Sequence, residues 1–252
     1  MSAIALSNPV VNRRPGFGRL TAVELRKMVD TRAGFWLPIG VALITVVAVV
    51  VTLLTGNDAQ HTLSHVFRNA LEPSAFLLPV MGVLLVTGEF SQRTAFTTFT
   101  LVPGRARVLM AKLAASLVVS AVALVVCLAV SVLGVALGSG TVGGLSAVMI
   151  PQAFVLLATA MITGVAFGAA VLISAPAIVV YLLLPTVWTV LVGSIHALRH
   201  VATWLDQSQT LGPLAEHPLS ATDWIHALAT LTVWMVVPLL IGTWRLLRRD
   251  VA

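Results

Sequence analysis

Long apolar stretches alternate with short polar segments along most of the 252-residue chain. Between Lys112 and Arg199 there is not one Asp, Glu, Lys or Arg. A helix that crosses a hydrocarbon core needs about 20 apolar residues. Runs of that length predict six membrane-spanning helices, at about 34–55, 71–88, 108–137, 147–173, 177–195 and 223–244. Such unbroken runs exclude a membrane β-barrel, in which apolar and polar residues alternate.

The uncharged stretch 147–195 is too long for a single span. Its best break is Ser174-Ala175-Pro176. A proline alone can kink a helix without ending it, so this break needs support from elsewhere.

The basic residues supply that support, because they accumulate on the cytosolic side of membrane proteins. Six spans with both termini in the cytosol place every Lys and Arg on that side except Arg68 and Arg199. Five spans would place the cluster at Arg245, Arg248 and Arg249 outside. We therefore predict six spans.

Three segments outside the spans have patterns of their own. In the cytosolic leader, 1–33, apolar residues recur at helical spacing among basic ones from 13 to 32. This predicts an amphipathic helix on the inner membrane surface, with a solvated charged leader as the alternative. The segment 89–107 is the longest internal cytosolic loop, and it mixes charges, hydroxyls and phenylalanines. On the outer side, 196–222 contains Trp and His, which favours an interfacial or partly re-entrant hairpin.

Composition agrees with this pattern. Hydrophobic residues make up 58% of the chain, charged residues make up 10%, and the mean hydropathy is +1.01. A soluble domain has about a quarter charged residues. The predicted fold class is therefore all-α, as a single membrane domain over 1–252. The net charge of +6 does not indicate a nucleic-acid partner, because the basic residues lie at the ends of apolar spans.

All six histidines fall on the predicted outer side. The pairs His61/His65 and His196/His200 have the i, i+4 spacing that lets two side chains share a metal on one helix face. No Glu follows either first histidine, so neither pair is a metalloprotease motif. We predict no metal and no cofactor in this chain.

Small residues recur at every fourth position in two predicted spans, a pattern that lets helix backbones approach closely. They are Gly134 and Gly138 in the third span and Ala160, Gly164 and Gly168 in the fourth. Packing within the chain is the preferred interpretation, and a dimer interface is the alternative.

Two features of self-powered transporters are missing from the sequence. There is no G-x-x-x-x-G-K-[ST] phosphate loop, since neither lysine, Lys27 or Lys112, follows a glycine. No ionisable residue is expected in the middle of a span, where such residues mark ion pathways. Lys112 enters the third span, and its long side chain is expected to reach back to the interface. The energy for transport is therefore predicted to come from another subunit.

Two stretches resemble segments of the membrane subunit of type-2 ABC exporters, the ATP-driven permease family with six helices per subunit. Val23-Glu24-Leu25-Arg26-Lys27 with Thr31-Arg32 is similar to the family's amphipathic entry helix. The stretch from Gly88 to Thr94, followed by Pro103 to Lys112, is similar to its coupling segment. There an acidic residue precedes an Arg-Thr step and a Lys-bearing entry to the third helix. The likeness in architecture covers nearly the whole chain, but the turn at 174–176 is shorter and less charged than a second coupling segment would be.

The resemblance implies a transport subunit that is not itself an enzyme, in a bacterial plasma membrane. Its partners would be two copies of a cytosolic ATPase that binds ATP and Mg²⁺, a second permease subunit, identical or paralogous, and membrane lipid. The coupling segment would contact the ATPase through Glu89, Phe90, Arg93, Thr94, Arg105 and Arg107. The entry helix would contribute Glu24, Arg26, Lys27 and Arg32. An alternative interpretation pairs Glu89 locally with Arg93.

The predicted function is export of a hydrophobic or amphipathic substrate, such as a drug, lipid or peptide. Two other classes stay open. One is a stand-alone secondary transporter or channel. The other is a membrane-embedded metalloenzyme that uses the outer histidines.

Overall fold

The computed structural model describes residues 16–56, 61–91, 104–138, 140–195 and 198–248, and over these ranges the chain is helical. The helices are α1 (Phe17–Asp30), α2 (Arg32–Thr55), α3 (Leu63–Ser91), α5 (Arg105–Leu137), α6 (Met149–Val171), α7 (Ser174–Ser194), α8 (Arg199–Leu205), α9 (Gln207–Leu211), α10 (Pro213–Glu216), α11 (Ala221–Leu231), the π-helical turn η3 (Thr232–Val236) and α12 (Val237–Arg248). Six stretches within the described ranges are long and apolar enough to cross a membrane: α2, α3, α5, α6, α7 and the continuous run α11–η3–α12. The prediction of an all-α, multi-pass membrane protein with six such helices is confirmed.

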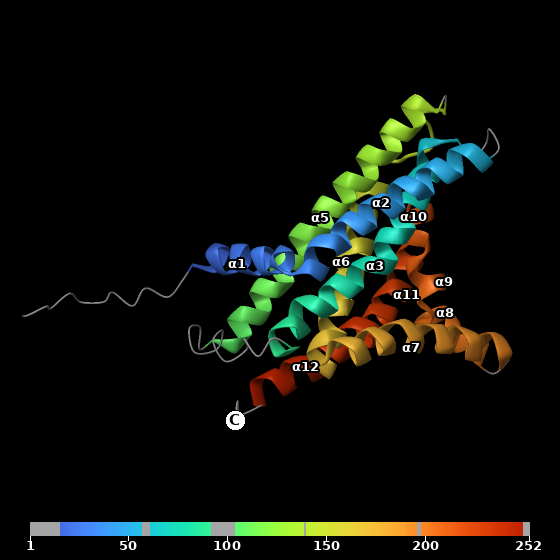
Figure 1. The fold of residues 1–252 in the computed structure, drawn as a ribbon. Coiled ribbons are helices and arrows are strands. Elements are labelled where there is room, and N and C mark those ends of the chain that lie inside the picture. The colour runs from blue at the N-terminus through green and yellow to red at the C-terminus, as the bar shows by residue number, and fades with distance from the viewer. Residues whose placement is uncertain (1–15, 57–60, 92–103, 139, 196–197, 249–252) are drawn as a thin grey trace, which may run out of the picture.

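The centre of the bundle is the pair α3 and α6, with α2 and α5 on one side and α7 and α12 on the other (Figure 1). The two central helices approach each other through glycines. A Cβ on Gly164 of α6 would collide with the carbonyl of Pro79, and one on Gly82 of α3 would collide with the carbonyl of Met161. Gly168 is nearly as close, since its Cβ would lie 3.0 Å from the Val83 oxygen. Backbone contact of this kind is how membrane helices pack without large side chains.

The second small-residue pair lies against α2. A Cβ on Gly134 would lie 2.6 Å from Cγ1 of Val49, and one on Gly138 would lie 3.3 Å from Cδ1 of Leu53. Ala160, in contrast, lines a cavity rather than a helix contact. Four of the five predicted packing residues therefore contact other helices of the same chain.

The break between the fourth and fifth spans lies earlier than 174–176. Helix α6 ends at Val171, and Leu172 takes a left-handed conformation with φ 66°. Helix α7 then begins at Ser174, so Pro176 lies in its first turn. Proline is tolerated there because its missing N–H would have no partner within the helix. The predicted break is thus wrong by two residues, although its proline does mark a helix start.

The second span starts at Leu63 rather than 71, so Arg68 and Glu72 lie inside α3. These charges lie toward the start of α3, and Lys112 lies near the start of α5, so the middle of each of these helices remains uncharged. Tertiary contacts explain part of the difference. Arg68 forms an ion pair with Glu216 at 3.2 Å, and the neighbouring Asn69 donates a hydrogen bond of 2.9 Å to a threonine of α2.

The segment predicted as a hairpin folds, from residue 198 on, into α8, α9 and α10, and lies against the last span. Thr230 donates to the Trp204 carbonyl and accepts from Thr210, each at 2.8 Å. The Trp234 indole N–H, within the π-helical turn, donates to the Leu205 carbonyl at 2.8 Å. Three hydrogen bonds therefore hold the short helices to one face of α11 and η3.

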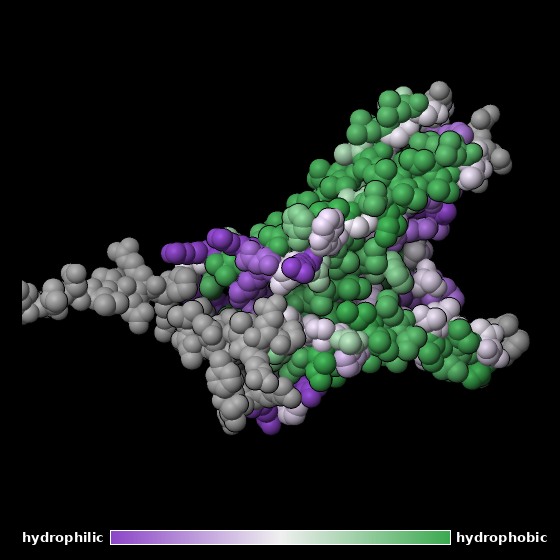
Figure 2. Space-filling view, in the orientation of Figure 1, coloured by the Kyte–Doolittle hydropathy of each residue, from purple (hydrophilic) through white to green (hydrophobic). Residues whose placement is uncertain are grey.

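The outer surface of the bundle is strongly apolar (Figure 2). Large hydrophobic side chains are exposed along α2, such as Trp36 and Leu43, and along α7, such as Leu183 and Val190. Polar side chains gather around α1 instead, which lies across the direction of the long helices (Figures 1 and 2). Apolar surface of this extent requires lipid or another apolar subunit around it.

Candidate functional site

Four charged side chains meet where α1 lies against α3 and α5. Glu24 and Lys27 are three residues apart and therefore share a face of α1. Glu89 comes from the last turn of α3, and Lys112 comes from near the start of α5. We call these four residues the charge cluster.

The sharp joint between α1 and α2 brings the first two residues into place. Helix α1 ends at Asp30, and the Thr31 hydroxyl caps α2 by accepting a hydrogen bond of 2.9 Å from Gly34 N–H. A Cβ on Gly34 would collide with the Met28 carbonyl, so only glycine allows this approach. The joint turns α1 across the bundle end, and Glu24 and Met28 become buried.

Lys112 and Glu24 are the most enclosed members of the charge cluster, and Lys112 makes three contacts. Its Nζ lies 2.5 Å from Glu24 Oε2, 3.0 Å from Glu89 Oε1 and 3.0 Å from the Leu85 carbonyl. An ammonium group has three N–H donors, and here each has an acceptor. The side chain is 5% exposed and bound inside the chain, so its ammonium group is held by protein acceptors rather than by solvent.

Lys27 closes the arrangement from the other side. Its Nζ lies 2.8 Å from Glu24 Oε1 and 2.7 Å from Glu89 Oε1. Each lysine therefore contacts both carboxylates, and each carboxylate contacts both lysines. The four formal charges sum to zero.

The neutral charge balance of the cluster matters for stability because most of its side chains are buried. The side chains of Glu24 and Lys112 are each 5% exposed and that of Glu89 is 8% exposed, whereas Lys27 is 35% exposed. Ions taken out of water are costly unless they are paired and hydrogen-bonded. Removing one member leaves a buried charge without compensation, at a cost of about 3–5 kcal/mol.

The pKa of Lys27 reflects the same balance. Burial alone lowers it, but hydrogen bonds and charge interactions with Glu24 and Glu89 outweigh burial, and the pKa rises above the ordinary 10.5. A raised lysine pKa contributes stability that is fully present below the unfolded value and is lost as the pH rises through the folded value. The attachment of α1 is therefore expected to persist throughout the neutral range.

Two residues of the charge cluster, Glu89 and Lys112, flank the segment 92–103 in the sequence. Glu89 is two residues from the end of α3 at Ser91, and α5 begins at Arg105, seven residues before Lys112. The intervening 92–103, which contains the predicted contacts Arg93 and Thr94, is outside the described residues. The cluster thus joins α1 to the two helices that flank this segment.

The other predicted site residues lie around the charge cluster rather than in it. Phe90 is partly buried and packs on the hydrophobic core. Arg26 is exposed and 4.0 Å from Asp30, and Arg32 is also exposed. Arg107 is half-buried in the first turn of α5, and of Arg105 the structure describes only the backbone.

The sequence pointed to Glu24, Lys27 and Glu89 but not to the contact of both carboxylates with Lys112. Glu24 and Lys112 are 88 positions apart, so no local spacing connects them. One signal was available: the chain has only two lysines among 15 basic residues, and both belong to the charge cluster. A compact ammonium on a flexible stem can reach several acceptors, whereas a guanidinium needs a planar arrangement.

The histidine pairs are not brought together with further ligands in the part of the chain that the structure describes. There, no three His, Cys, Asp or Glu side chains are grouped as metal ligands would be. His196 lies outside the described residues, and Cys127 is a buried thiol in α5.

Comparison with known proteins adds no assignment, since the sequence matches no protein-family model and no curated protein.

Proposed function

We propose that the chain is the membrane-spanning permease subunit of an ATP-driven exporter of the type-2 ABC class. It moves a hydrophobic or amphipathic substrate out of the cell, and a separate cytosolic subunit hydrolyses ATP. The charge cluster is the observation that carries this proposal.

A segment that transmits movement from an ATPase to membrane helices must be rigidly attached to those helices. Glu89 precedes 92–103 and Lys112 follows it, and the two side chains are in direct contact. Glu24 and Lys27 connect the same point to α1. Movement of the segment would therefore shift α1, α3 and α5 together, which is the rigid-body behaviour expected of a coupled transporter.

The proposal gives Glu89 a different role from direct contact with the ATPase. Its carboxylate is 8% exposed and in contact with two lysines, so it suits positioning of the segment. Contact with the ATPase falls to Arg93 and Thr94, together with Arg105 and Arg107. Guanidinium groups are suited to such contacts because they bind carboxylates through two parallel hydrogen bonds.

The orientation in this proposal rests on the basic residues. The leader, the segment 89–107 and the C-terminal arginines lie in the cytosol, and the short helices α8–α10 lie outside. Two such permease subunits, identical or paralogous, would assemble with two ATPases that bind ATP and Mg²⁺. The membrane is a bacterial plasma membrane.

Co-expression with a phosphate-loop ATPase, sought first among the neighbouring genes, tests the proposal. The ATPase is expected to co-purify with the chain, and Arg93→Ala combined with Thr94→Ala should reduce the bound amount about tenfold without changing the thermal stability of the chain. Glu24→Gln should lower both the amount of bound ATPase and the thermal stability, because it removes one carboxylate of the charge cluster that anchors the segment.

Asp30→Asn is the matched control, since it neutralises an exposed carboxylate on the same helix as Glu24. Both the bound ATPase and the stability should be unchanged. If no ATPase co-purifies, or if the Arg93 and Thr94 variant binds it fully, the assignment of the coupling segment is wrong.

A stand-alone secondary transporter is the second candidate, and Glu72 is the observation that favours it. This carboxylate lies in α3 and lines a cavity, where a proton or cation could be exchanged. Uptake into inverted vesicles separates the two candidates. Uptake driven by a pH gradient without ATP would favour the secondary transporter.

A further inference from the structure

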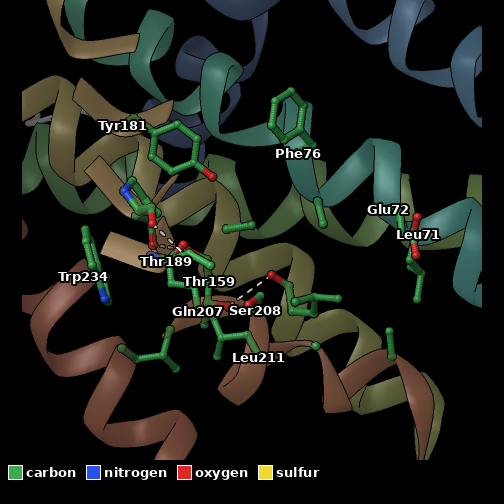
Figure 3. A pocket seen from close by; sticks show the side chains of 18 of the residues that line it. Leu71, Glu72, Phe76, Thr159, Tyr181, Thr189, Gln207, Ser208, Leu211 and Trp234 are labelled. Atoms are coloured by element: carbon green, nitrogen blue, oxygen red, sulfur yellow. Dashed lines mark hydrogen bonds between the residues drawn. The ribbon is translucent and has the colours of Figure 1, made fainter. Parts of the chain in front are cut away.

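A cavity of about 410 Å³ lies between α3, α6, α7 and the short helices α9 and α10 (Figure 3). It extends from the end of the bundle near Glu216 to the middle of α6 at Thr163. Its size is within the range of sites that bind small molecules, about 300–1,000 Å³. None of the charge-cluster residues lines it.

The lining is mostly apolar and aromatic. Leu71, Phe76, Leu156, Leu211, Leu231 and Trp234 contribute to the walls. Figure 3 shows the rings of Phe76, Tyr181 and Trp234 around the space, with the Tyr181 hydroxyl pointing into it. Such walls accommodate the apolar part of a ligand, and aromatic faces also attract cations.

The threonines of the lining present acceptors rather than donors. Thr159, Thr163, Thr186 and Thr189 each donate their hydroxyl proton to a carbonyl of their own helix, at 2.7–3.1 Å. A hydroxyl has one donor and two acceptor positions, so lone pairs remain for a ligand. The polar part of the lining therefore suits a ligand that carries N–H donors.

The charged residues of the lining also favour a ligand that carries N–H donors. Two acidic residues, Glu72 and Glu216, and one arginine, Arg68, are among the residues that line the cavity, and Glu72 is also exposed. Arg68 pairs with Glu216 at 3.2 Å. Within the described ranges, Glu72 has no ion pair or hydrogen bond. It lies one turn before Phe76, so the two residues share a face of α3. One net negative charge thus lies beside an aromatic wall.

We propose that this cavity binds an amphipathic amine. The protonated nitrogen would lie between the Glu72 carboxylate and the Phe76 ring, and the apolar part would lie against Leu156, Leu231 and Trp234. The Arg68 Nε, which is buried and has no acceptor among the residues that the structure describes, would donate to an ether or hydroxyl oxygen of the ligand. This inference rests on the proposed function, because it gives the chemical class of the exported substrate.

Binding of propranolol, an aromatic secondary amine, to the chain alone in neutral phosphatidylcholine nanodiscs tests the site. Tritiated propranolol is measured directly. Its neutral diol counterpart, in which a hydroxyl replaces the alkylamine, is measured by competition. Propranolol should bind at least about tenfold more tightly than the diol, and Glu72→Gln should remove this difference while the affinity for the diol stays the same.

Asp223→Asn is the matched control, because this carboxylate is in the first turn of the helix that follows α10 but does not line the cavity, and the asparagine side-chain oxygen can still accept the hydrogen bond from Ser220 N–H. Ala160→Phe and Thr186→Phe should each fill the cavity and abolish binding of both compounds. Their elution in size-exclusion chromatography shows that they fold. Equal affinity for amine and diol, or binding that survives both filled variants, would overturn the proposal.

Failure of this inference is distinguishable from failure of the proposed function, since the binding measurement needs no ATPase. Amine binding without ATPase association would retain the site and reject the ABC assignment. ATPase association without selectivity for the amine over the diol would retain the ABC assignment and reject the amine site.

Discussion

Glu24 and Lys112 each make two ion pairs, so the energetic effect of losing one depends on which others remain. Without Lys112, two buried carboxylates share Lys27 alone. Without both Glu24 and Lys112, the Lys27–Glu89 pair at 2.7 Å remains intact and neutral. The loss of a matched pair is therefore expected to cost less than the sum of the two single losses.

A double-mutant cycle tests this expectation. Lys112→Met should lower the free energy of unfolding by about 3–5 kcal/mol, and Glu24→Gln should have a similar effect. The double variant should recover about 1–3 kcal/mol of the summed loss. Unfolding by sodium dodecyl sulfate in mixed micelles measures all three. Strict additivity would show that the two side chains do not interact.

The charge cluster also shows how far residue-level prediction can go. Glu24, Lys27 and Glu89 were singled out in the sequence as candidate contacts with an ATPase or with the membrane surface, and the structure places them together. The place of Lys112 was not foreseen, because a lysine near the start of an apolar span has an ordinary explanation in the interface. Its true surroundings depend on the α1–α2 joint at Gly34, which brings Glu24 across the bundle. Sequence spacing carries no information on that contact.

Among the helices, α3 and α6 depend most on small residues, because their backbones touch. No side chain separates Gly164 from the Pro79 carbonyl or Gly82 from the Met161 carbonyl. Close packing cannot absorb an added methyl group without moving one helix. The α3–α6 contact also forms a wall of the amine cavity, so its geometry affects binding as well as stability.

Gly164→Ala should therefore lower the free energy of unfolding by about 1–3 kcal/mol. Gly40→Ala is the control in α2, where an added Cβ meets no atom within 4 Å. It should stabilise the chain by about 0.5–1 kcal/mol, because alanine favours the helix. Denaturation in the same mixed micelles compares the two. Equal effects would mean that the α3–α6 backbone contact is looser than described.

Helix boundaries were predictable where the sequence carries its own signal. The helix start near Pro176 was found to within a few residues. The start of α3 was missed because Arg68 makes its early part look like a loop. The residue is accommodated by Glu216, which is 148 positions away. Hydropathy cannot show that a charge has a distant partner.

At the scale of the whole molecule, the orientation in the membrane is the prediction on which the cytosolic site depends. Helix α5 offers a direct test, since Gly104 precedes it and Val142 follows it, and both are exposed. With Cys127→Ala as background, Val142→Cys should react with a membrane-impermeant maleimide on intact cells. Gly104→Cys should react only after permeabilisation. The opposite pattern would place the charge cluster outside and reject the ATPase proposal.

The π-helical turn at Thr232–Val236 has a consequence for how the last span, α11–η3–α12, tolerates changes in length. Such a turn accommodates one residue more than an α-helix of the same rise. Deleting one residue there would restore regular α-helix and keep the faces on both sides in phase. The same deletion in α12 would rotate everything beyond it by about 100°. Related chains that differ by one residue in this helix are therefore best aligned with the gap at 232–236.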